Sequence, residues 1–378
     1  MVSVIDLDKV LNYGNCAIIE SMYPLSTYGW TQELDSTWKS LAFSDTQPAR
    51  VVADFGTSLK VALPEVITAE LSGKLAHYTS RQDGPKVGDW ISVRVSSNGH
   101  AVIEAVMPRQ SELARKVAGN QTVKQVIAAN VDVAFVLLAV GNDFNLDRLR
   151  RFLYQLSVSN IKPVIVLNKT DKTRDIDIYL SQLNQFKLPI ILTAAIEGVG
   201  VDELLDFIQP GNTAVLLGSS GVGKSTLTNH LLGRSAQKTQ TVRESDETGK
   251  HTTVHRELFV LPNGGLLVDM PGIRELQLWG TEEDLADNFD DVTALARQCK
   301  YTTCRHGGED GCAIQQALKD GRLEPSRYAA YVKMKSELQA LEQRTATLAK
   351  RGSEKAKRTA VKKRNENSLK DMRSGRHE

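Results

Sequence analysis

Hydrophobic and polar positions follow two different patterns along this chain. Between residues 49 and 118, short runs in which apolar and polar residues alternate, such as WISVRV, are separated by turn-forming stretches such as RQDGPKVGD. That pattern predicts a small antiparallel β-barrel. From about residue 119 onward, apolar runs typical of buried strands alternate with amphipathic stretches typical of helices. The second pattern predicts a parallel sheet covered by helices on both faces.

The second region supplies a regular series of elements. Five apolar runs are expected to form strands, namely VDVAFVLLAV, PVIVLN, PIILT, TAVLLG and GLLV. The helical patterns between the first four of them cover residues 146–159, 178–186 and 201–208. Farther on, Thr281 before two glutamates is typical of a helix start, so a helix is expected over residues 281–298. Pro325 is expected to begin the last helix, because proline suits a first helical turn.

A chain of 378 residues is long enough for two or three domains. The patterns divide it into an N-terminal extension over residues 1–48, the barrel over 49–118, the α/β domain over 119–277, a small helical domain over 278–345 and a basic tail over 346–378. From residue 350 onward the tail holds eleven Lys and Arg against four Asp and Glu, whereas the whole chain carries a net charge of only +2. This excess suggests a polyanionic partner, and a solvated charged segment is the ordinary alternative.

The sequence carries no sign of secretion or membrane insertion. Its first residues lack a cationic start followed by an apolar stretch. The longest apolar run, residues 133–140, is far shorter than the roughly 20 residues of a membrane-spanning helix. We therefore expect a cytoplasmic protein without a membrane partner.

The segment GSSGVGKS has the spacing of a phosphate-binding loop. It follows the expected strand TAVLL and precedes a helical stretch, which is the context that the motif requires. In such a loop the backbone N–H groups point at phosphate oxygens, the lysine reaches the β and γ phosphates, and the serine hydroxyl binds Mg²⁺. A glycine-rich turn before a helix is the alternative. The predicted nucleotide contacts are Gly218, Ser219, Ser220, Gly221, Val222, Gly223, Lys224, Ser225 and Thr226, of which Ser225 is also a predicted Mg²⁺ ligand.

A second motif, NKTD, is suited to recognise a guanine base. It follows the expected strand PVIVL, at the edge where open α/β sheets bind ligands. The Asp171 carboxylate can accept hydrogen bonds from N1–H and the 2-amino group of guanine, whereas adenine would leave it unpaired. Asn168 can bridge the base and the phosphate loop, and Lys169 can cover the ring. The predicted base contacts are Asn168, Lys169, Thr170 and Asp171, with Thr193, Ala194 and Ala195 after the next strand, where a simple turn is the alternative.

The segment DMPG supplies a third part of the predicted site. Asp269 is expected to hold Mg²⁺ through water, and the N–H group of Gly272 is expected to sense the γ-phosphate. The stretch before it, residues 242–260, is polar and contains glycine, so it is expected to include a mobile loop. There Thr252 or Thr253 can complete the Mg²⁺ shell when the γ-phosphate is present, and Thr253 is slightly preferred. The predicted cofactors are thus GTP or GDP and Mg²⁺.

The order of these motifs is unusual, because NKTD precedes the phosphate loop by fifty residues. A typical guanine-nucleotide switch has the phosphate loop first. Ligand geometry depends on which strand ends meet rather than on chain order, so a circular permutation leaves such a site intact. It also places the segment after DMPG directly before a group of cysteines.

Three of the four cysteines lie close to a histidine near the C-terminus. Cys299, Cys304, His306 and Cys312 have the spacing C-x4-C-x-H-x5-C. Three thiolates and one imidazole suit a closed tetrahedral Zn²⁺ site with a structural task, and the alternative is a loop with reduced cysteines. One Zn²⁺ is therefore predicted.

Taken together, these features resemble one family. The permuted order, DMPGIRE, the GKHTT loop and QCKYTTCRHGGEDGC are similar to the ribosome small subunit-dependent GTPase A family of bacteria, over about residues 50–345. The resemblance implies a multidomain protein with an all-β OB-fold barrel, a circularly permuted α/β P-loop GTPase domain, and a small α-helical zinc-binding domain with a basic tail. It also implies a GTP-hydrolysing factor in late maturation of the 30S subunit, stimulated by that subunit. The implied partners are the 30S subunit and its 16S rRNA, and the protein is expected to be a monomer.

One position departs from ordinary GTPases. Where many of them place a water-orienting glutamine after DMPG, this chain has Ile273. An aliphatic side chain cannot orient water by hydrogen bonding, so slow intrinsic hydrolysis is expected. His251 is the candidate for that role, since the family also has a histidine there, and a merely solvated loop histidine is the alternative. The predicted catalytic set is Lys224, His251 and Thr253, with Ile273 at the glutamine position.

Two other functions stay open on the sequence alone. An ATPase or a kinase would share the phosphate loop, and a preference for guanine over adenine would separate these enzymes from a GTPase. An RNA-binding scaffold with an inactive nucleotide site is the other alternative. The presence of Lys224, Ser225 and Asp269 argues against the scaffold, because these residue types carry out phosphoryl transfer.

Overall fold

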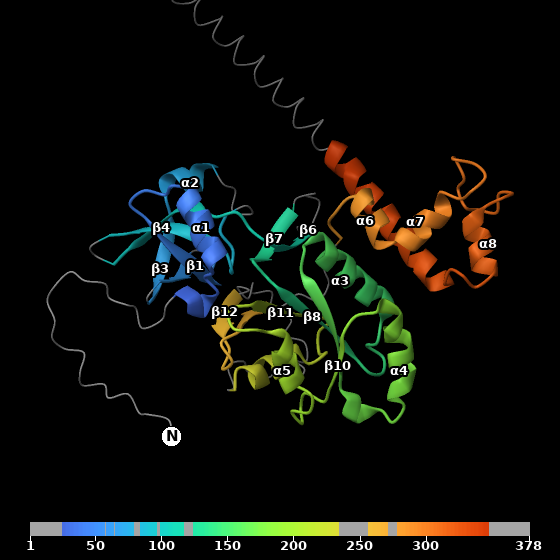
Figure 1. Ribbon diagram of the computed structural model, residues 1–378, viewed down its shortest axis with the longest axis horizontal. Coiled ribbons are helices and arrows are strands. Elements are labelled where there is room, and N and C mark those ends of the chain that lie inside the picture. The colour runs from blue at the N-terminus through green and yellow to red at the C-terminus, as the bar shows by residue number, and fades with distance from the viewer. Residues whose placement is uncertain are drawn as a thin grey trace, which may run out of the picture.

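A β-barrel, an α/β sheet and a group of C-terminal helices follow one another along the chain (Figure 1). The computed structural model describes residues 25–56, 58–63, 65–78, 84–96, 99–116, 124–233, 256–270 and 278–347. Most of the predicted basic tail and the first half of the predicted N-terminal extension lie outside the described residues. In the parts of the chain that are described, no helix combines the length and apolar character needed to cross a bilayer.

Five strands close the barrel. They pair in the order β1-β2-β3-β5-β4, and β4 pairs back with β1. Contrary to the expectation of an all-antiparallel barrel, β3 and β5 run parallel, because a helix and strand β4 intervene between them in the chain. This connectivity fits the OB-fold. The elements are β1 (Gln47–Asp54), β2 (Leu59–Ala62), β3 (Val66–Leu71), α2 (Gly73–Tyr78), β4 (Trp90–Val95) and β5 (Ala101–Val106).

The α/β sheet has parallel strands in the order β10-β9-β8-β11-β13, with β12 antiparallel at its edge. Strands β9 and β10 follow β8 on one side, and the chain then crosses to β11 on the other side of β8. In open α/β sheets, ligands bind at the carboxyl ends of the strands where the order reverses in this way. The strands are β8 (Val133–Ala139), β9 (Lys162–Asn168), β10 (Ile190–Thr193), β11 (Thr213–Leu217), β12 (Arg256–Val260) and β13 (Leu266–Asp269).

Helices cover both faces of this sheet, as predicted. Alternate residues of β8 point to opposite faces, so that Val136 packs with α3 (Leu146–Val158) and α4 (Ile176–Leu183), whereas Phe135 packs with α5 (Lys224–Leu231). The predicted helices over 146–159 and 178–186 are confirmed within a few residues. The third, over 201–208, is instead a 3₁₀ helix over Asp202–Phe207.

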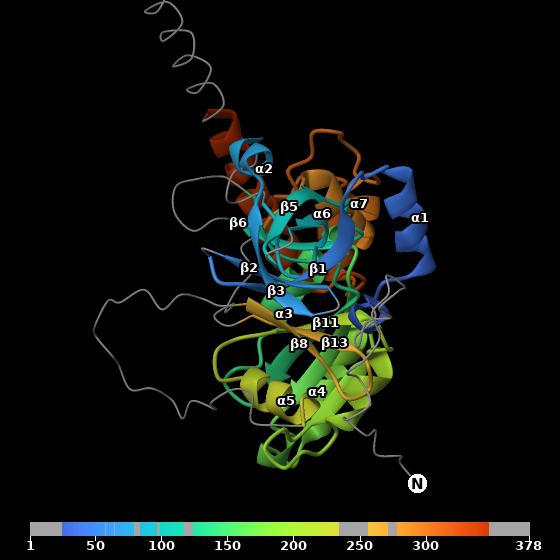
Figure 2. The same cartoon turned by 90° about the vertical axis from the view of Figure 1, so that its left-hand side faces the viewer.

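Barrel and α/β sheet are joined through the backbone. Strand β1 pairs with β12, with Ala53 opposite Glu257, so the two units form one 11-stranded sheet (Figure 2). Five consecutive residues of β1 are buried because this strand belongs to both units. A two-stranded ribbon, β6 (Glu112–Lys116) and β7 (Lys124–Ala129), lies between them in the chain.

The buried Arg50 guanidinium on β1 also ties these units together. It donates to the carbonyl oxygens of Gly88 and Asn130, both at 3.2 Å, to that of Tyr28, and to Thr213 Oγ1 at 2.8 Å. Thr213 begins β11, whereas Tyr28 precedes helix α1 (Gln32–Ser40) of the N-terminal segment. Burial lowers the pKa of Arg50 to about 10, against the opposing effect of Asp132 and Asp89, and the side chain stays charged at neutral pH.

The C-terminal helices pack on α3. They are α6 (Glu282–Asn288), α7 (Asp290–Ala296), α8 (Ala313–Lys319) and a helix over residues 325–347, which begins at Pro325 as predicted. The single helix expected over 281–298 is wrong, because Phe289 has φ −123° and ψ 47°, outside the helical region. Its buried ring lies 5.5 Å from the ring of Tyr331, so the chain turns there to bury it. Thr281 caps α6 with Asp284 in a reciprocal capping box.

Candidate functional site

The loop GSSGVGKS lies between β11 and α5, at the carboxyl edge of the sheet. Gly218 and Gly223 have φ of 151° and 113°, a region that favours glycine. A Cβ on Gly218 would lie 2.8 Å from the Leu137 carbonyl oxygen, and one on Gly223 would lie 2.1 Å from Asn168 Nδ2. Both glycines are therefore required by close contacts with residues of β8 and β9 as well as by their backbone conformation.

The Lys224 ammonium is held within this loop. Its Nζ donates to the carbonyl oxygens of Gly218 at 2.7 Å and Ser219 at 2.6 Å. Lys224 is also the first residue of α5, so an anion on the loop would meet this charge together with the N–H groups of the first helical turn. Ser220 and Ser225 are exposed, whereas Val222 is fully buried beneath the loop.

Asn168, the first residue of NKTD, joins three segments of the site. Its side chain is buried, and Nδ2 donates to the Val222 carbonyl oxygen of the phosphate loop at 2.7 Å. Its Oδ1 accepts from Thr193 Oγ1 at 2.9 Å and from the Ala195 N–H at 3.1 Å. The two motifs that the sequence separates by fifty residues are thus in direct contact.

The rest of NKTD lies beside the end of β10. Thr170 Oγ1 donates to the Thr193 carbonyl oxygen at 3.1 Å. Lys169 has φ 62°, which is uncommon for a residue with a side chain and turns the chain sharply after β9. Asp171 follows in a 3₁₀ turn with its side chain exposed, while Thr193, Ala194 and Ala195 are buried.

Asp269 ends β13 at the same edge. The preceding residue, Val268, pairs with Val215 of β11, two residues before that strand ends. This register places Asp269 beside the end of β11, the strand that leads into the phosphate loop. Other predicted site residues lie outside the described part of the chain, namely His251, Thr252, Thr253, Gly272 and Ile273.

Asp143, which is not among the residues predicted from the sequence, contacts the phosphate loop. Its carboxylate accepts a hydrogen bond from the Ser219 hydroxyl and another from Arg148 Nη1 at 2.9 Å. Asp143 follows β8, which is a direct neighbour of β11 in the sheet. An acidic residue just after an expected buried strand was the available signal, because parallel strands carry such residues to one edge.

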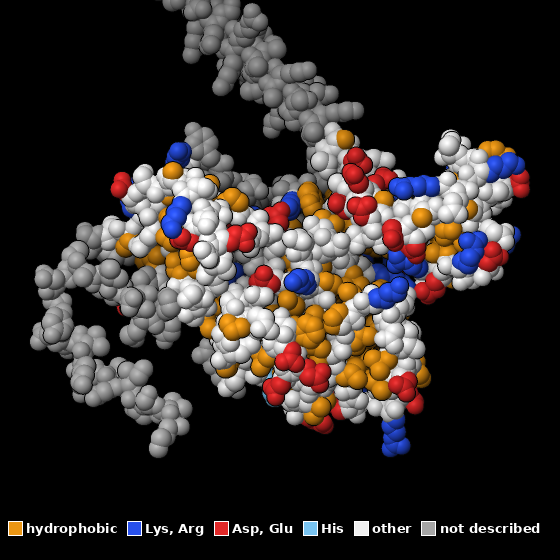
Figure 3. All heavy atoms as spheres, viewed as in Figure 1, with side chains coloured by type: hydrophobic (Ala, Val, Ile, Leu, Met, Phe, Trp, Pro, Cys, Tyr) orange, Lys and Arg blue, Asp and Glu red, His pale blue; other side chains and the backbone are white. Residues whose placement is uncertain are grey.

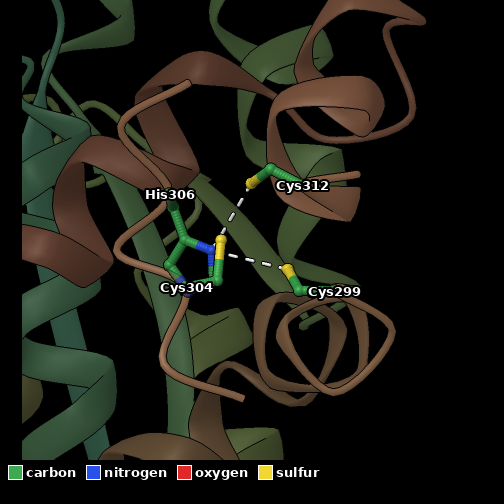
Figure 4. A group of neighbouring side chains, drawn as sticks. All are labelled: Cys299, Cys304, His306 and Cys312. Carbon is green, nitrogen blue, oxygen red and sulfur yellow. Dashed lines mark hydrogen bonds between the residues drawn. The ribbon is translucent and has the colours of Figure 1, made fainter. Parts of the chain in front are cut away.

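The four predicted metal ligands converge in space (Figure 4). Their donor atoms all lie within 4.8 Å of one another, and His306 Nδ1 is 3.6 Å from the sulfurs of Cys299 and Cys312. With Zn–S of about 2.3 Å and Zn–N of about 2.0 Å, a tetrahedral ion would separate sulfur and nitrogen by about 3.5 Å. The cluster therefore fits a tetrahedral zinc ion.

Backbone geometry and hydrogen bonds hold these ligands in place. His306 has φ 59°, and its carbonyl oxygen accepts from Gln315 Nε2 at 2.6 Å. Burial raises the pKa of the Cys299 thiol, but hydrogen bonds from the backbone of Ala313 and Ile314 outweigh it, so the net effect lowers that pKa. The lowered pKa favours the thiolate at Cys299, the form that binds metal. At Cys304 a hydrogen bond from the His306 backbone lowers the pKa, but burial and the neighbouring Cys312 and Cys299 outweigh it and raise that pKa to about 11.

Comparisons with known proteins agree with this geometry. A family model described as RsgA GTPase matches residues 106–279. The small ribosomal subunit biogenesis GTPase RsgA of Opitutus terrae is 39% identical over 327 residues, which cover 83% of this chain and 89% of the relative.

Solved structures show the same architecture. The crystal structure of YjeQ from Thermotoga maritima has a TM-score of 0.59 and 27% identity, and it covers 78% of this chain and 98% of that protein. The crystal structure of YloQ, described as a circularly permuted GTPase, has a TM-score of 0.55 and 23% identity, with 79% of this chain and 97% of that protein covered. The chain therefore has a circularly permuted GTPase fold and belongs to the RsgA GTPase family.

Proposed function

We propose that this chain hydrolyses GTP in the late assembly of the small (30S) ribosomal subunit. The observation that carries the proposal is the contact of Asn168 with Val222, which sets a guanine-selective motif directly beside a phosphate loop. The ribosomal part rests on relatives such as the one from Opitutus terrae, which are named for small ribosomal subunit biogenesis. The 16S rRNA is the proposed contact within that subunit, and the protein is proposed to act as a monomer.

Each part of the site has a proposed role in binding GTP. The carboxylate of Asp171 recognises guanine, with Lys169 over the ring and the Ala195 region toward the base oxygen. The phosphate loop holds the phosphates through its N–H groups and Lys224. The remaining proposed contacts are Thr170, Thr193, Ala194, Ser219, Ser220, Gly221, Gly223 and Thr226 along the loops, with Thr252 and Gly272 near the γ-phosphate.

The proposed Mg²⁺ ligands are oxygen donors at the edge beside the phosphates. The Ser225 hydroxyl and the Asp269 carboxylate suit a hard divalent cation, and Thr253 would supply a third oxygen. When bound, Mg²⁺ neutralises charge that develops on the phosphates. Lys224 stabilises the same charge from the loop side, and His251 orients the attacking water in place of the glutamine that Ile273 replaces. Slow hydrolysis in the absence of the ribosomal subunit follows from that replacement.

The other units have proposed roles around this site. Cys299, Cys304, His306 and Cys312 hold one Zn²⁺ that fixes the fold of the helical domain over residues 278–345. The barrel over residues 49–118 flanks the GTPase domain over 119–277, and the basic tail over 346–378 contacts rRNA phosphates with strong salt dependence. Within the extension over residues 1–48, helix α1 packs on the barrel through Leu34 and Trp90.

The decisive experiment measures GTP and ATP turnover with and without purified 30S subunits. We expect turnover of GTP but not ATP, and stimulation by the subunit. Asp171→Asn should weaken GTP binding and shift the preference toward xanthosine triphosphate, because the amide can donate to the 2-oxygen of xanthine. Equal turnover of ATP and GTP would contradict guanine recognition, and a rate that 30S subunits leave unchanged would contradict the ribosomal role.

A further inference from the structure

A carboxylate lies against the phosphate loop, where a bound nucleotide would bring further negative charge. Asp143 Oδ2 accepts from the Ser219 hydroxyl, and Asp143 Oδ1 accepts from Arg148 Nη1 at 2.9 Å. Ser219 is buried, whereas about a third of the Asp143 side chain is exposed. The Asp143 carboxylate and the phosphates of a bound nucleotide would repel each other at close range, so a cation is needed beside Asp143 to offset this repulsion.

Arg148 supplies the compensating charge and is itself fixed. It lies in the first turn of α3, and its N–H group donates to the capping Asn145 Oδ1 at 2.8 Å. The body of α3 is held in turn by the C-terminal helices, through Arg151 to Glu337 at 2.7 Å. In Figure 3, Lys and Arg side chains gather where the α/β sheet meets these helices. The Asp143 carboxylate is therefore attached to a rigid element rather than to a free loop.

The contact continues from Ser219 to the lysine of the loop. The Ser219 side chain is held by Asp143, and the Ser219 carbonyl oxygen accepts from Lys224 Nζ at 2.6 Å. Fixing the side chain of Ser219 restricts the backbone of the same residue. Asp143 is therefore linked to the Lys224 ammonium through a single residue, Ser219.

We propose that Asp143 is a positioning residue for GTP, which orients Lys224 toward the terminal phosphates through Ser219. This inference rests on the proposed function, since it assumes that GTP occupies the loop. Loss of Asp143 misplaces the Lys224 ammonium but keeps its charge in the loop, so it weakens contacts that are similar in the ground state and the transition state. Such a loss of uniform binding raises KM more than it lowers kcat, whereas removal of the charge itself lowers kcat.

The test is a double-mutant cycle on steady-state GTP hydrolysis by the full chain. Asp143→Ala and Ser219→Ala should each raise KM for GTP about three- to tenfold, with kcat changed less than twofold. The double variant should be no worse than either single variant, because both remove the same contact. Ser219→Thr keeps the hydroxyl and should restore the wild-type KM. Asp147→Asn is the matched control, because that exposed carboxylate pairs with the buried Arg150, whose other partners include Gln185 and Ser326, and it should leave KM unchanged.

The possible outcomes separate this inference from the proposed function. Additive KM effects, equal losses in KM and kcat, or a Ser219→Thr variant as weak as Ser219→Ala would overturn the positioning role and indicate general disturbance of the loop. Active wild-type protein together with unchanged KM in both alanine variants would overturn the inference alone. Wild-type protein without GTP turnover would overturn the proposed function and this inference with it.

Discussion

The metal cluster takes its four side chains from residues 299–312, whereas the nucleotide site draws its side chains from the carboxyl ends of five strands, between Asp143 and Asp269. In the cluster, local turns bring the ligands together, and contacts between them are weak until an ion joins them. In the nucleotide site, Asn168 already ties the motifs together through three hydrogen bonds.

The two sites obtain their stability in different ways. A cluster of thiols and an imidazole is stabilised by the ion that it binds. Folding of the surrounding segment is therefore coupled to metal binding. A site built on strand ends takes its geometry from the sheet and keeps it without a ligand. Loss of the ligand should therefore unfold one region and leave the other in place.

Removal of zinc is the largest expected effect. Structural zinc in small domains contributes on the order of 10 kcal/mol. Cys312 belongs to the apolar core of the C-terminal helices, and Cys299 and Cys304 pack against that core, so loss of the ion should disturb it. A strong chelator should abolish amide hydrogen-exchange protection between residues 299 and 323 while leaving β8, β9 and β11 protected. Mass spectrometry of exchanged peptides measures both regions in one experiment.

Cys304→Ser tests the same prediction by removing one zinc ligand instead of the ion. It should reproduce the exchange pattern of the chelated wild-type protein, and its nucleotide affinity should stay within about twofold. Loss of protection in the strands as well would contradict this expectation, because it would mean that the two regions fold as one unit.

Lys224→Ala should have the next largest effect, confined to the other region. The Lys224 ammonium stabilises the negative charge that develops on the phosphates in the transition state, and loss of such a preorganised group lowers kcat by about 100-fold or more. Single-turnover hydrolysis measures this loss, and zinc content by elemental analysis should stay at the wild-type value. Turnover within tenfold of wild type would remove Lys224 from the proposed mechanism.

Asn168→Ala tests whether hydrogen bonds keep the nucleotide site assembled. The substitution leaves a buried carbonyl oxygen, a hydroxyl and an N–H group without a partner, which costs about 1–3 kcal/mol in the free energy of unfolding. Urea unfolding in the absence of nucleotide measures it. Asn184→Ala, at the exposed end of α4, is the control and should change stability by less than about 0.5 kcal/mol. An equal effect of both substitutions would contradict the preformed site.

A pH series gives the smallest expected effect, in the helices around the cluster. Burial raises the pKa of Asp291, but hydrogen bonds from Arg327, at 2.6 and 2.7 Å, outweigh it and lower that pKa below its usual value. A lowered pKa in the folded state stabilises the protein above the unfolded pKa of about 3.9, and this stability is lost as the pH falls through the folded pKa.

The pair lies near the surface, so the effect should be below about 1 kcal/mol. The measurement is the difference in urea midpoint between wild type and Arg327→Gln at pH 6 and at pH 3. The difference should shrink at the lower pH. A constant difference would show that Arg327 acts through its packing on Phe289 rather than through the carboxylate.

Local patterns predicted much of the fold and of both sites. The alternation of Phe135 and Val136 between two cores, the start of the last helix at Pro325 and the convergence of the four metal ligands all follow from residues close together in the chain. The contact of Asn168 with Val222 followed from the rule that parallel strands end at one edge.

Features that depend on distant partners were not predictable in this way. The break at Phe289 arises because its ring packs on Tyr331, forty-two residues later in the chain. Whether β5 runs parallel or antiparallel to its neighbour depends on which barrel strand it pairs with, here β3. Asp143 belongs to the site only because Ser219, seventy-six residues later, donates a hydrogen bond to it. Sequence periodicity reports whether a side chain is buried but not which residue covers it.

The pairing of β1 with β12 limits how this protein can be divided. A GTPase unit produced without its barrel would leave Arg256 and Glu257 of β12 without the strand that they pair with, and an unpaired strand edge is a template for aggregation. A barrel produced alone would expose the outer side of β1, where Val52 packs into the core of the α/β sheet. The smallest soluble fragment of this chain should therefore contain both units.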